Sequence, residues 1–381
     1  MTIAVNTRFL SGKYLEGDGY FTYETFKRIT KNYPEHRFIF IFDRNFDDQL
    51  VFNSNITPVV VGSLARHPLL WRWWYDVKVP AVLRKYKADV FVSCDGFCSL
   101  TTNLPQCLVV HDFAFLHFPS FIKKSHLNFY KKYTKRFLDK ANSIATVSAF
   151  SKQEIISHYK VNADKIDIVG NAAKEIFRLL NSEKKQETRD KYSNGKEYFV
   201  YAGSIHPRKN LQVLLKAFSV FKKRQQSNLK LVLAGALAWK YKSFIKDLKT
   251  YKYKNDVVIT GSLDESELVN VIGSAYAMVY MSLFEGFGMP VLEAMHCEIP
   301  VITSAGSSTE EISKGNALLA DANDHEDIAD KMMRLYKDED LRNDLLKKGK
   351  PVAQEYSWEK TADLMWQCIL KAYNNRNKAM P

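Results

Sequence analysis

Residues 277–296 read AMVYMSLFEGFGMPVLEAMH. The stretch begins with apolar residues typical of a buried strand and continues through a turn that holds Gly286 and Gly288. Pro290 suits the first turn of a helix, and an apolar face begins at Val291. A strand, a glycine-containing turn and a helix in this order are typical of βαβ units, whose strands run parallel. The stretch therefore predicts an α/β protein with a parallel sheet.

The same alternation of strand and helix patterns extends through both halves of the chain. Strands are expected at 3–5, 38–42, 57–61, 90–93, 106–110, 143–147 and 165–169, and again at 198–202, 230–234, 256–260, 277–280 and 300–303. Helical patterns include 20–31 and 121–140, and the polar stretch 181–196 reads as a connector with a short surface helix. We therefore expect two Rossmann-like parallel-sheet domains facing a central cleft, with ligands at the carboxyl ends of the strands.

Composition places the chain among globular proteins. Of its 381 residues, 46% are hydrophobic, which argues against disorder. No apolar run reaches the roughly 18 residues that a membrane-spanning helix needs, and the N-terminus does not resemble a signal peptide. The five cysteines are scattered, which indicates reduced thiols, a cytoplasmic location and no metal.

The chain carries a formal net charge of +13. This excess indicates an anionic partner, and nucleic acid, an acidic membrane face and a phosphate-bearing small molecule all fit it.

Two glutamates bracket the glycine turn, with seven residues between Glu285 and Glu293. Gly286 and Gly288 let the backbone approach a ligand next to a helix N-terminus. Ionised carboxylates accept hydrogen bonds from hydroxyls, so the pair suits a hydroxyl-rich ligand. A helix cap plus a surface acid is the alternative interpretation.

A second segment, residues 202–211, reads AGSIHPRKNL and follows the first strand of the second half. The turn at Gly203, the cations Arg208 and Lys209 and a following helix N-terminus together predict an anion site, most naturally for a diphosphate. A solvated basic turn is the alternative.

These two segments, in this order and at this separation, resemble the donor site of retaining glycosyltransferases of family four, which have the two-domain GT-B fold. The resemblance extends to residues 300–304, 307–311 and 356–359, and in the first half to 15–20, 111–112 and 146–151. The subtype most resembles bacterial mannosyltransferase-like enzymes of O-antigen or capsule synthesis. It implies an N-terminal acceptor-side domain at 1–175, a donor-binding domain at 176–360 and a C-terminal helix at 361–381 that packs back on the first domain.

The resemblance also implies a role for each site residue. Arg208 and Lys209 would bind the diphosphate of a nucleotide sugar, and Glu293 the ribose hydroxyls. The sugar hydroxyls would be held by Glu285 and by the N–H groups of Phe287, Gly288 and Met289. From the other domain, His111 would sit over the sugar near the reacting carbon, and Gly17 and Gly19 would form a loop that approaches the phosphates. The sequence departs from the family pattern at Glu298, where a glycine is common, and at Asn171-Ala172-Ala173, where Asn-Gly is usual.

No cofactor or catalytic metal is expected. Residues 338–340 read DED, a formal Asp-x-Asp, but they lie in a charge-mixed helical pattern far from any strand end and read as a solvated face. The donor would therefore be used without a metal ion.

Two first-half stretches, residues 66–75 with 84–87 and residues 121–140, combine aromatic side chains with Lys and Arg. Such stretches suit an anionic membrane surface, and aromatic stacking with cations also suits single-stranded nucleic acid. With a lipid-linked or glycan acceptor, we expect peripheral attachment to the anionic inner face of the cytoplasmic membrane and no nucleic-acid partner. The alternative, with about equal weight, is that the aromatic side chains of these stretches face the core and the basic side chains face solvent.

Two other functions remain open for the chain: a nucleotide-sugar epimerase or phosphorylase of the same fold, and a non-enzymatic RNA- or glycan-binding protein.

Overall fold

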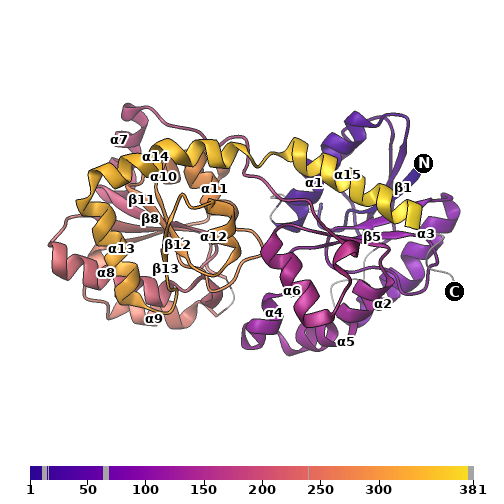
Figure 1. The fold of residues 1–381 in the computed structure, drawn as a ribbon, viewed down its shortest axis with the longest axis horizontal. Helices are drawn as coiled ribbons and strands as arrows, with labels where there is room; N and C mark the ends of the chain where they lie inside the picture. Colours follow the sequence, from indigo (N-terminus) through magenta and orange to yellow (C-terminus); the bar gives the residue numbers. More distant parts are fainter. Residues whose placement is uncertain (11–14, 16, 63–67, 239, 376–381) are drawn as a thin grey trace. The chain divides into compact units, whose positions relative to one another are not determined.

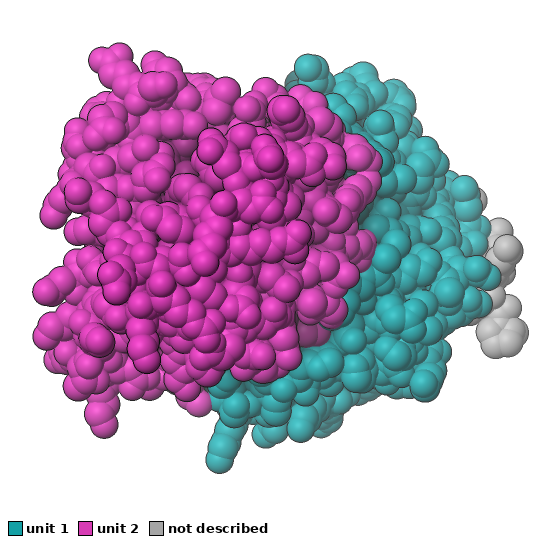
Figure 2. Space-filling view, turned by 60° about the vertical axis from the view of Figure 1, so that its left-hand side comes forward, with its two compact units in different colours: residues 1–171, 357–381 teal, residues 172–356 magenta. Residues whose placement is uncertain are grey.

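The computed structural model describes residues 1–10, 15, 17–62, 68–238 and 240–375. Its contacts divide the chain into unit 1, Met1–Asn171 with Ser357–Pro381, and unit 2, Ala172–Tyr356 (Figure 2). The chain passes from unit 1 to unit 2 between residues 171 and 172 and returns between residues 356 and 357. The domain boundaries predicted from the sequence follow residues 175 and 360. Parts of the stretches named above lie outside the described residues, namely Glu16, Arg66, His67 and residues 376–381.

Unit 1 is built on a seven-stranded parallel sheet in the order β3-β2-β1-β4-β5-β6-β7. The strands are β1 (Thr2–Asn6), β2 (Arg37–Phe42), β3 (Ile56–Val60), β4 (Val90–Ser93), β5 (Gln106–Val110), β6 (Ser143–Thr146) and β7 (Ile166–Ile168). Helices α1 (Asp18–Asn32) and α15 (Trp358–Asn374) lie on one side of the sheet, and α2 (Pro68–Trp73) and α5 (Lys124–Lys140) on the other (Figure 1). Helices on both faces explain why β5 is buried along its whole length.

Unit 2 contains a six-stranded parallel sheet in the order β10-β9-β8-β11-β12-β13. Its strands are β8 (Tyr198–Ala202), β9 (Lys230–Ala234), β10 (Val257–Gly261), β11 (Ala277–Tyr280), β12 (Val301–Ser304) and β13 (Leu318–Ala320). Its helices are α7 (Ser182–Ser193), α8 (Leu211–Gln225), α9 (Lys242–Lys249), α10 (Glu265–Gly273), α11 (Met289–His296), α12 (Ser308–Ser313), α13 (His325–Lys337) and α14 (Glu339–Gln354). Strand β13 was not predicted from the sequence, although β7, which is equally short, was. The predicted α/β class with two parallel sheets is confirmed.

The last helix, α15, returns the chain to unit 1 and lies against α1 (Figure 1). Glu359 near its start forms an ion pair with Arg28 of α1, with 2.7 Å between Oε1 and Nε. Further along α15, Lys371 Nζ lies 2.7 Å from a carboxylate oxygen of Asp167 in β7. Residues at the two ends of the chain therefore stabilise the same unit.

The two basic aromatic stretches turn most of their rings inward. Trp71 and Trp74 are buried, and so are Phe129 and Phe137 of α5, all in the same apolar core. Most of the aromatic side chains that the membrane prediction used are therefore part of the core, whereas Trp73 is exposed. The exposed side of α5 carries most of its cations, as the alternative interpretation expected. None of the described helices is long and apolar enough to cross a membrane.

The DED sequence begins a helix. Asp338 is the N-cap residue of α14, and its Oδ1 accepts a hydrogen bond of 2.9 Å from the Leu341 N–H. A capping carboxylate satisfies helix donors and interacts favourably with the helix dipole, which gives Asp338 a structural role.

Candidate active site

The two motifs of unit 2 meet because the strands that precede them are neighbours. β8 and β11 pair in parallel, with Phe199 opposite Ala277 and Val200 opposite Met278. Arg208 and Lys209 follow β8 in a short 3₁₀ turn, and Glu285 follows β11 in the loop before α11. Since parallel strands end at the same edge of a sheet, the cations and the carboxylate reach one place.

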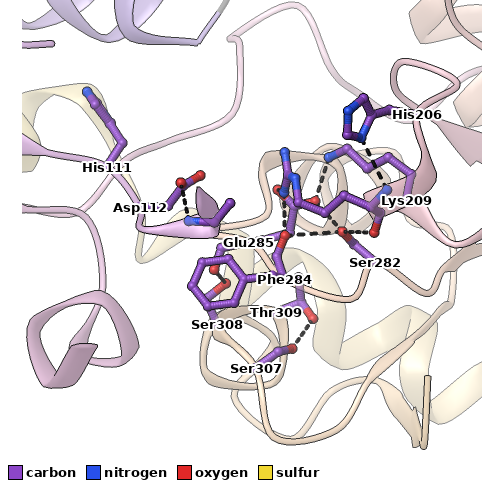
Figure 3. Close-up of polar contacts among 12 residues, drawn as sticks. His111, Asp112, His206, Lys209, Ser282, Phe284, Glu285, Ser307, Ser308 and Thr309 are labelled. Carbon is purple, nitrogen blue, oxygen red and sulfur yellow. Dashed lines mark hydrogen bonds and ion pairs between the residues drawn. The ribbon is translucent and has the colours of Figure 1, made fainter. Parts of the chain in front are cut away.

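Glu285, Arg208 and Lys209 form one ion-pair cluster, shown from one side in Figure 3. Glu285 Oε1 lies 2.5 Å from Lys209 Nζ, and Oε2 lies 3.1 Å from Arg208 Nη1. Tyr280 and Ser282 also donate hydroxyl hydrogen bonds to Oε1, over 3.0 and 2.5 Å. The side chains of Arg208, Lys209 and Glu285 keep 21%, 11% and 12% of their surface exposed, so a ligand has access to the charges.

The surroundings of Glu285 keep it ionised. Burial alone would raise its pKa, but the charges of Lys209 and Arg208, with hydrogen bonds from Lys209 and Ser282, outweigh burial and lower the pKa to about 2. Glu285 therefore has no proton to donate at neutral pH. It can accept hydrogen bonds or stabilise positive charge.

The loop backbone holds Arg208 in place. Its guanidinium donates to the carbonyl of Phe284, and the Leu283 N–H donates to the carbonyl of Arg208 over 2.9 Å. His206 caps the turn, because its Nδ1 accepts a hydrogen bond of 3.1 Å from the Arg208 N–H. Burial, with the nearby charges of Arg208 and Lys209, lowers the pKa of His206, so the ring stays neutral and Nδ1 remains an acceptor.

Gly288 is required by the turn before α11. Its φ is +109°, and a Cβ atom there would lie 2.6 Å from Cγ2 of Thr309. The loop is therefore pressed against the start of α12, where the Ser308 hydroxyl donates to the Glu285 carbonyl over 2.8 Å (Figure 3). Met289 begins α11, and the first turn of a helix leaves N–H groups without intrahelical acceptors. Together with Gly288 and the buried Phe287, this turn offers backbone N–H groups as hydrogen-bond donors to a ligand.

Glu293 occupies a separate, buried environment in α11. Burial raises its pKa to about 7, while the charge of Lys174 lowers it and that of Glu265 raises it. Lys174 is itself paired with Glu265 at 2.6 Å. Glu293 is thus a buried acid that is easily protonated, in contrast to Glu285.

His111, of the site residues expected in the first half, lines a pocket of about 270 Å³ in unit 1. Its polar wall includes Asp18, Asp95, His111 and Asp112, and its apolar wall is rich in aromatic rings. His111 Nε2 lies 3.0 Å from the Cys94 carbonyl oxygen and 3.5 Å from Asp18 Oδ1. The ring of His111 packs edge-on against Phe21, so the histidine is held by the fold.

Gly17 and Gly19 differ from the expected loop. Gly17 is the N-cap residue of α1, with a φ of +51°, and Gly19 lies inside the first turn of that helix. A Cβ atom on Gly19 would lie 2.7 Å from the carbonyl oxygen of Phe9, so Gly19 allows close packing. The helix begins two residues before the expected start at Tyr20, because Gly17 ends the preceding segment.

Comparisons with known proteins agree with this geometry. Residues 172–352 match the family model of the glycosyl transferases group 1, and residues 30–174 match that of glycosyltransferase family 4. The chain belongs to the group 1/family 4 glycosyltransferases. Its two parallel-sheet units are those of the GT-B fold.

The relatives of this glycosyltransferase include proteins of surface-glycan synthesis. It is 26% identical to O-antigen chain mannosyltransferase B of Escherichia coli, over 91% of this chain and 93% of that protein. It is 27% identical to O-antigen chain mannosyltransferase RfbU of Salmonella typhimurium, over 74% and 75% of the two chains. The crystal structure of WaaG, a glycosyltransferase involved in lipopolysaccharide biosynthesis, matches with a TM-score of 0.73 at 13% identity, covering 96% of this chain and 99% of the other.

The structure brings some of the expected site residues of this glycosyltransferase together. Arg208, Lys209 and Glu285 share one cluster, and Gly203 lies at the end of β8 on the same sheet edge. Tyr280 and Ser282 were not expected there. Their hydroxyls lie five and three residues before Glu285 in the chain, and only the fold of the loop turns them onto its carboxylate.

Proposed function

We propose that this chain transfers a hexose from a nucleotide-diphosphate sugar to a hydroxyl of a glycan or lipid-linked acceptor, with retention of the anomeric configuration, in surface-polysaccharide synthesis. The observation that carries the proposal is the accessible cluster of two cations and one ionised carboxylate at the carboxyl ends of β8 and β11. The cluster supplies the charges that a diphosphate and a developing sugar cation require.

Arg208 and Lys209 are proposed to bind the diphosphate and to stabilise the negative charge that develops on it as the bond to the sugar breaks. Both cations neutralise Glu285 in the structure described here. A bound diphosphate would compete for them, and its charge would take over part of the pairing. Two fixed cations meet the need that a metal ion meets in other enzymes, so no metal is proposed for this step.

Glu285 is proposed to accept hydrogen bonds from sugar hydroxyls and to stabilise positive charge near the anomeric carbon. With a pKa of about 2 it is not a general acid. In a retaining reaction the acceptor enters on the face from which the nucleotide leaves, and the departing phosphate oxygen can accept the acceptor's proton. The protein then mainly positions the reactants and stabilises charge.

The remaining residues have supporting roles in the proposal. Glu293 binds the ribose hydroxyls, and the N–H groups of Phe287, Gly288 and Met289 contact the sugar. From unit 1, His111 is proposed to contact the donor sugar, and Gly17 and Gly19 to approach the phosphates.

The pocket of unit 1 is proposed to hold the acceptor. Aromatic rings such as Phe97, Phe115 and Tyr130 suit the apolar face of a sugar ring, and Asp18 and Asp112 suit its hydroxyls. Asp18 and Asp112 disfavour an anionic group, and Asp95 is already paired with Arg8, so a neutral sugar is proposed as the part of the acceptor that enters. Mannose is the first donor sugar to test, because both O-antigen relatives are named as mannosyltransferases.

Location is part of the same proposal. We place the enzyme in the cytoplasm, with peripheral contact to the inner face of the membrane through the basic side of α5. Co-sedimentation with anionic vesicles at low salt should detect this contact, and salt should weaken it because surface charges are screened over about 8–10 Å. Equal recovery with neutral vesicles would contradict it.

The transfer reaction is tested by incubating the chain with a panel of radiolabelled nucleotide sugars, with and without a mannose-containing acceptor, in the presence of EDTA. Transfer or slow donor hydrolysis is the expected result. Formation of an isomeric nucleotide sugar would indicate an epimerase, and no turnover of any donor would contradict enzymatic transfer. Glu285→Gln should lower kcat strongly with a smaller loss of nucleotide affinity, whereas Glu293→Ala should mainly weaken donor binding.

A further inference from the structure

A cluster of ionisable side chains in unit 1 lies outside the residues assigned to sugar transfer. It joins His117, the last residue of α4 (Ala114–His117), to Glu154 and His158 of α6 (Ala149–Tyr159). Glu154 and His158 are four residues apart in the chain and therefore share one face of α6. Two elements far apart in the sequence thus supply three potential metal ligands.

The three side chains converge on one point. Oε2 of Glu154 contacts Nε2 of His117 and lies 3.5 Å from Nε2 of His158. The two imidazole rings meet edge to face, with centroids 5.4 Å apart. One ligand atom from each residue lies within 4.8 Å of the other two. In a tetrahedral zinc site, with bonds of 2.0–2.1 Å, the ligand atoms are about 3.4 Å apart, which small rotations of these side chains would reach.

The donor set and its exposure fit a transition-metal ion. Two imidazole nitrogens and one carboxylate oxygen are ligands that zinc accepts, with a fourth position left for water. The side chains of His117, Glu154 and His158 keep 34%, 16% and 42% of their surface exposed, so an ion and its water can enter from solvent.

We propose that His117, Glu154 and His158 form a binding site for a divalent transition-metal ion, with Zn²⁺ as the ion that the ligands suit. The site has a structural role. It would link the end of α4 to α6. Phe115 of α4 and the residues just before this helix, His111, Asp112 and Phe113, line the unit 1 pocket. A bound ion would restrict the motion of this pocket wall.

Isothermal titration of Zn²⁺ into the chelator-treated full chain tests the site directly. We expect one strong site per chain and an affinity at least about tenfold weaker in His117→Ala and His158→Ala. Glu154→Gln keeps the size of the side chain and should also weaken binding. Cobalt(II) should give the visible absorption of a four-coordinate site in the wild type and lose it in the same variants.

His325→Ala is the matched control, because His325 is also an exposed histidine beside a glutamate, with 3.8 Å between its Nε2 and Glu326 Oε1. Its zinc affinity should equal that of the wild type. Absence of stoichiometric binding, or equal affinity in His117→Ala and His158→Ala, would overturn the proposal. Since titration needs no substrate, this outcome is independent of the proposed transfer reaction.

The effect on the pocket rests on the proposed function. Removing zinc should raise the KM for the acceptor and leave donor hydrolysis without acceptor unchanged. An unchanged acceptor KM, with zinc binding confirmed, would overturn the link between the ion and the pocket wall.

Discussion

Each unit places a charge cluster at the same position of its sheet, but the two clusters differ in access. In unit 1, Arg8 follows β1 and Asp95 follows β4, and these strands are neighbours. In unit 2, Arg208 and Lys209 follow β8 and Glu285 follows β11, again neighbours. The topology therefore brings cation and carboxylate together in both units.

Arg8 and Asp95 are enclosed by protein. Their charged atoms are 3.1 Å apart, and the side chains keep only 6% and 2% of their surface exposed. Aromatic rings surround the guanidinium, including Phe9 at 4.8 Å and Trp71 at 5.7 Å from its carbon. Asp95 also accepts hydrogen bonds from Asn6 and Tyr75. A pair this enclosed has a structural role, whereas the more exposed pair of unit 2 can exchange its partner for a ligand.

The largest expected effect of this difference is on stability. Arg8→Ala leaves the buried Asp95 without its cation, and breaking such a pair costs about 3–5 kcal/mol. We expect a large loss in the free energy of unfolding, measured by urea denaturation followed by circular dichroism. Lys209→Ala should lose far less, because Glu285 keeps its contact with Arg208. Similar losses in the two variants would contradict the distinction.

Glu293 in unit 2 is also a buried acid, but the cation that acts on it, Lys174, is paired with Glu265. Its pKa of about 7 lies above the ordinary 4.5, so the folded chain keeps a proton that the unfolded chain loses between these pH values. Its contribution to stability therefore falls as pH rises from about 4.5 to about 7. Glu293→Gln removes the ionisable group and should raise the free energy of unfolding at pH 8 by up to about 3 kcal/mol.

The same Glu293 variant should weaken donor binding, because it loses a carboxylate proposed to hold ribose hydroxyls.

Denaturation at pH 5 provides the control for the stability prediction, since the gain in stability of Glu293→Gln should shrink towards zero at that pH. An equal gain at pH 5 and pH 8 would show that ionisation of Glu293 is not its cause.

The cations of unit 2 should affect catalysis more than folding. Arg208→Ala and Lys209→Ala should each lower kcat/KM by on the order of 100-fold, since each removes a charge that is proposed to stabilise the leaving diphosphate. Lys216→Ala, on the exposed side of α8, is the matched control and should change kcat/KM less than twofold. Activities within a few-fold of wild type in the first two variants would exclude these residues from the donor site.

The smallest expected effect concerns Glu298, which stands where the family commonly has glycine. Its φ is +55°, in the left-handed region that a side chain makes unfavourable. Glu298→Gly should stabilise the chain by about 0.5–1 kcal/mol, reduced by loss of the ion pair with Lys350 at 3.1 Å. Thermal unfolding checks this, and a lower melting temperature would show that the ion pair outweighs the strain.

Twelve of the thirteen strands in the described residues were predicted from the sequence, because most of them are short apolar runs between polar turns. The family resemblance implied that Arg208, Lys209 and Glu285 bind one donor molecule, and the three side chains do lie together in the structure. The sequence did not predict that these charges neutralise each other, which depends on side-chain positions in two loops.

The Arg8–Asp95 pair shows the limit most clearly. Arg8 follows the first strand, and Asp95 lies 87 residues further along the chain. No local pattern joins them, because their contact follows from the pairing of β1 with β4. In the aromatic stretches, the periodicity was equally consistent with a membrane face and with a core, and the burial of Trp71 and Trp74 was decided by tertiary packing.

The central claim, that the cluster of unit 2 supports transfer of a sugar with retention, is tested most directly by the product of a single reaction. The chain would be incubated with an α-linked nucleotide sugar labelled with ¹³C at the anomeric carbon and with an acceptor, and the new linkage analysed by NMR. The account predicts an α-linked product in the wild type and very little product in Glu285→Gln. A β-linked product would contradict both the proposed mechanism and the role given to Glu285.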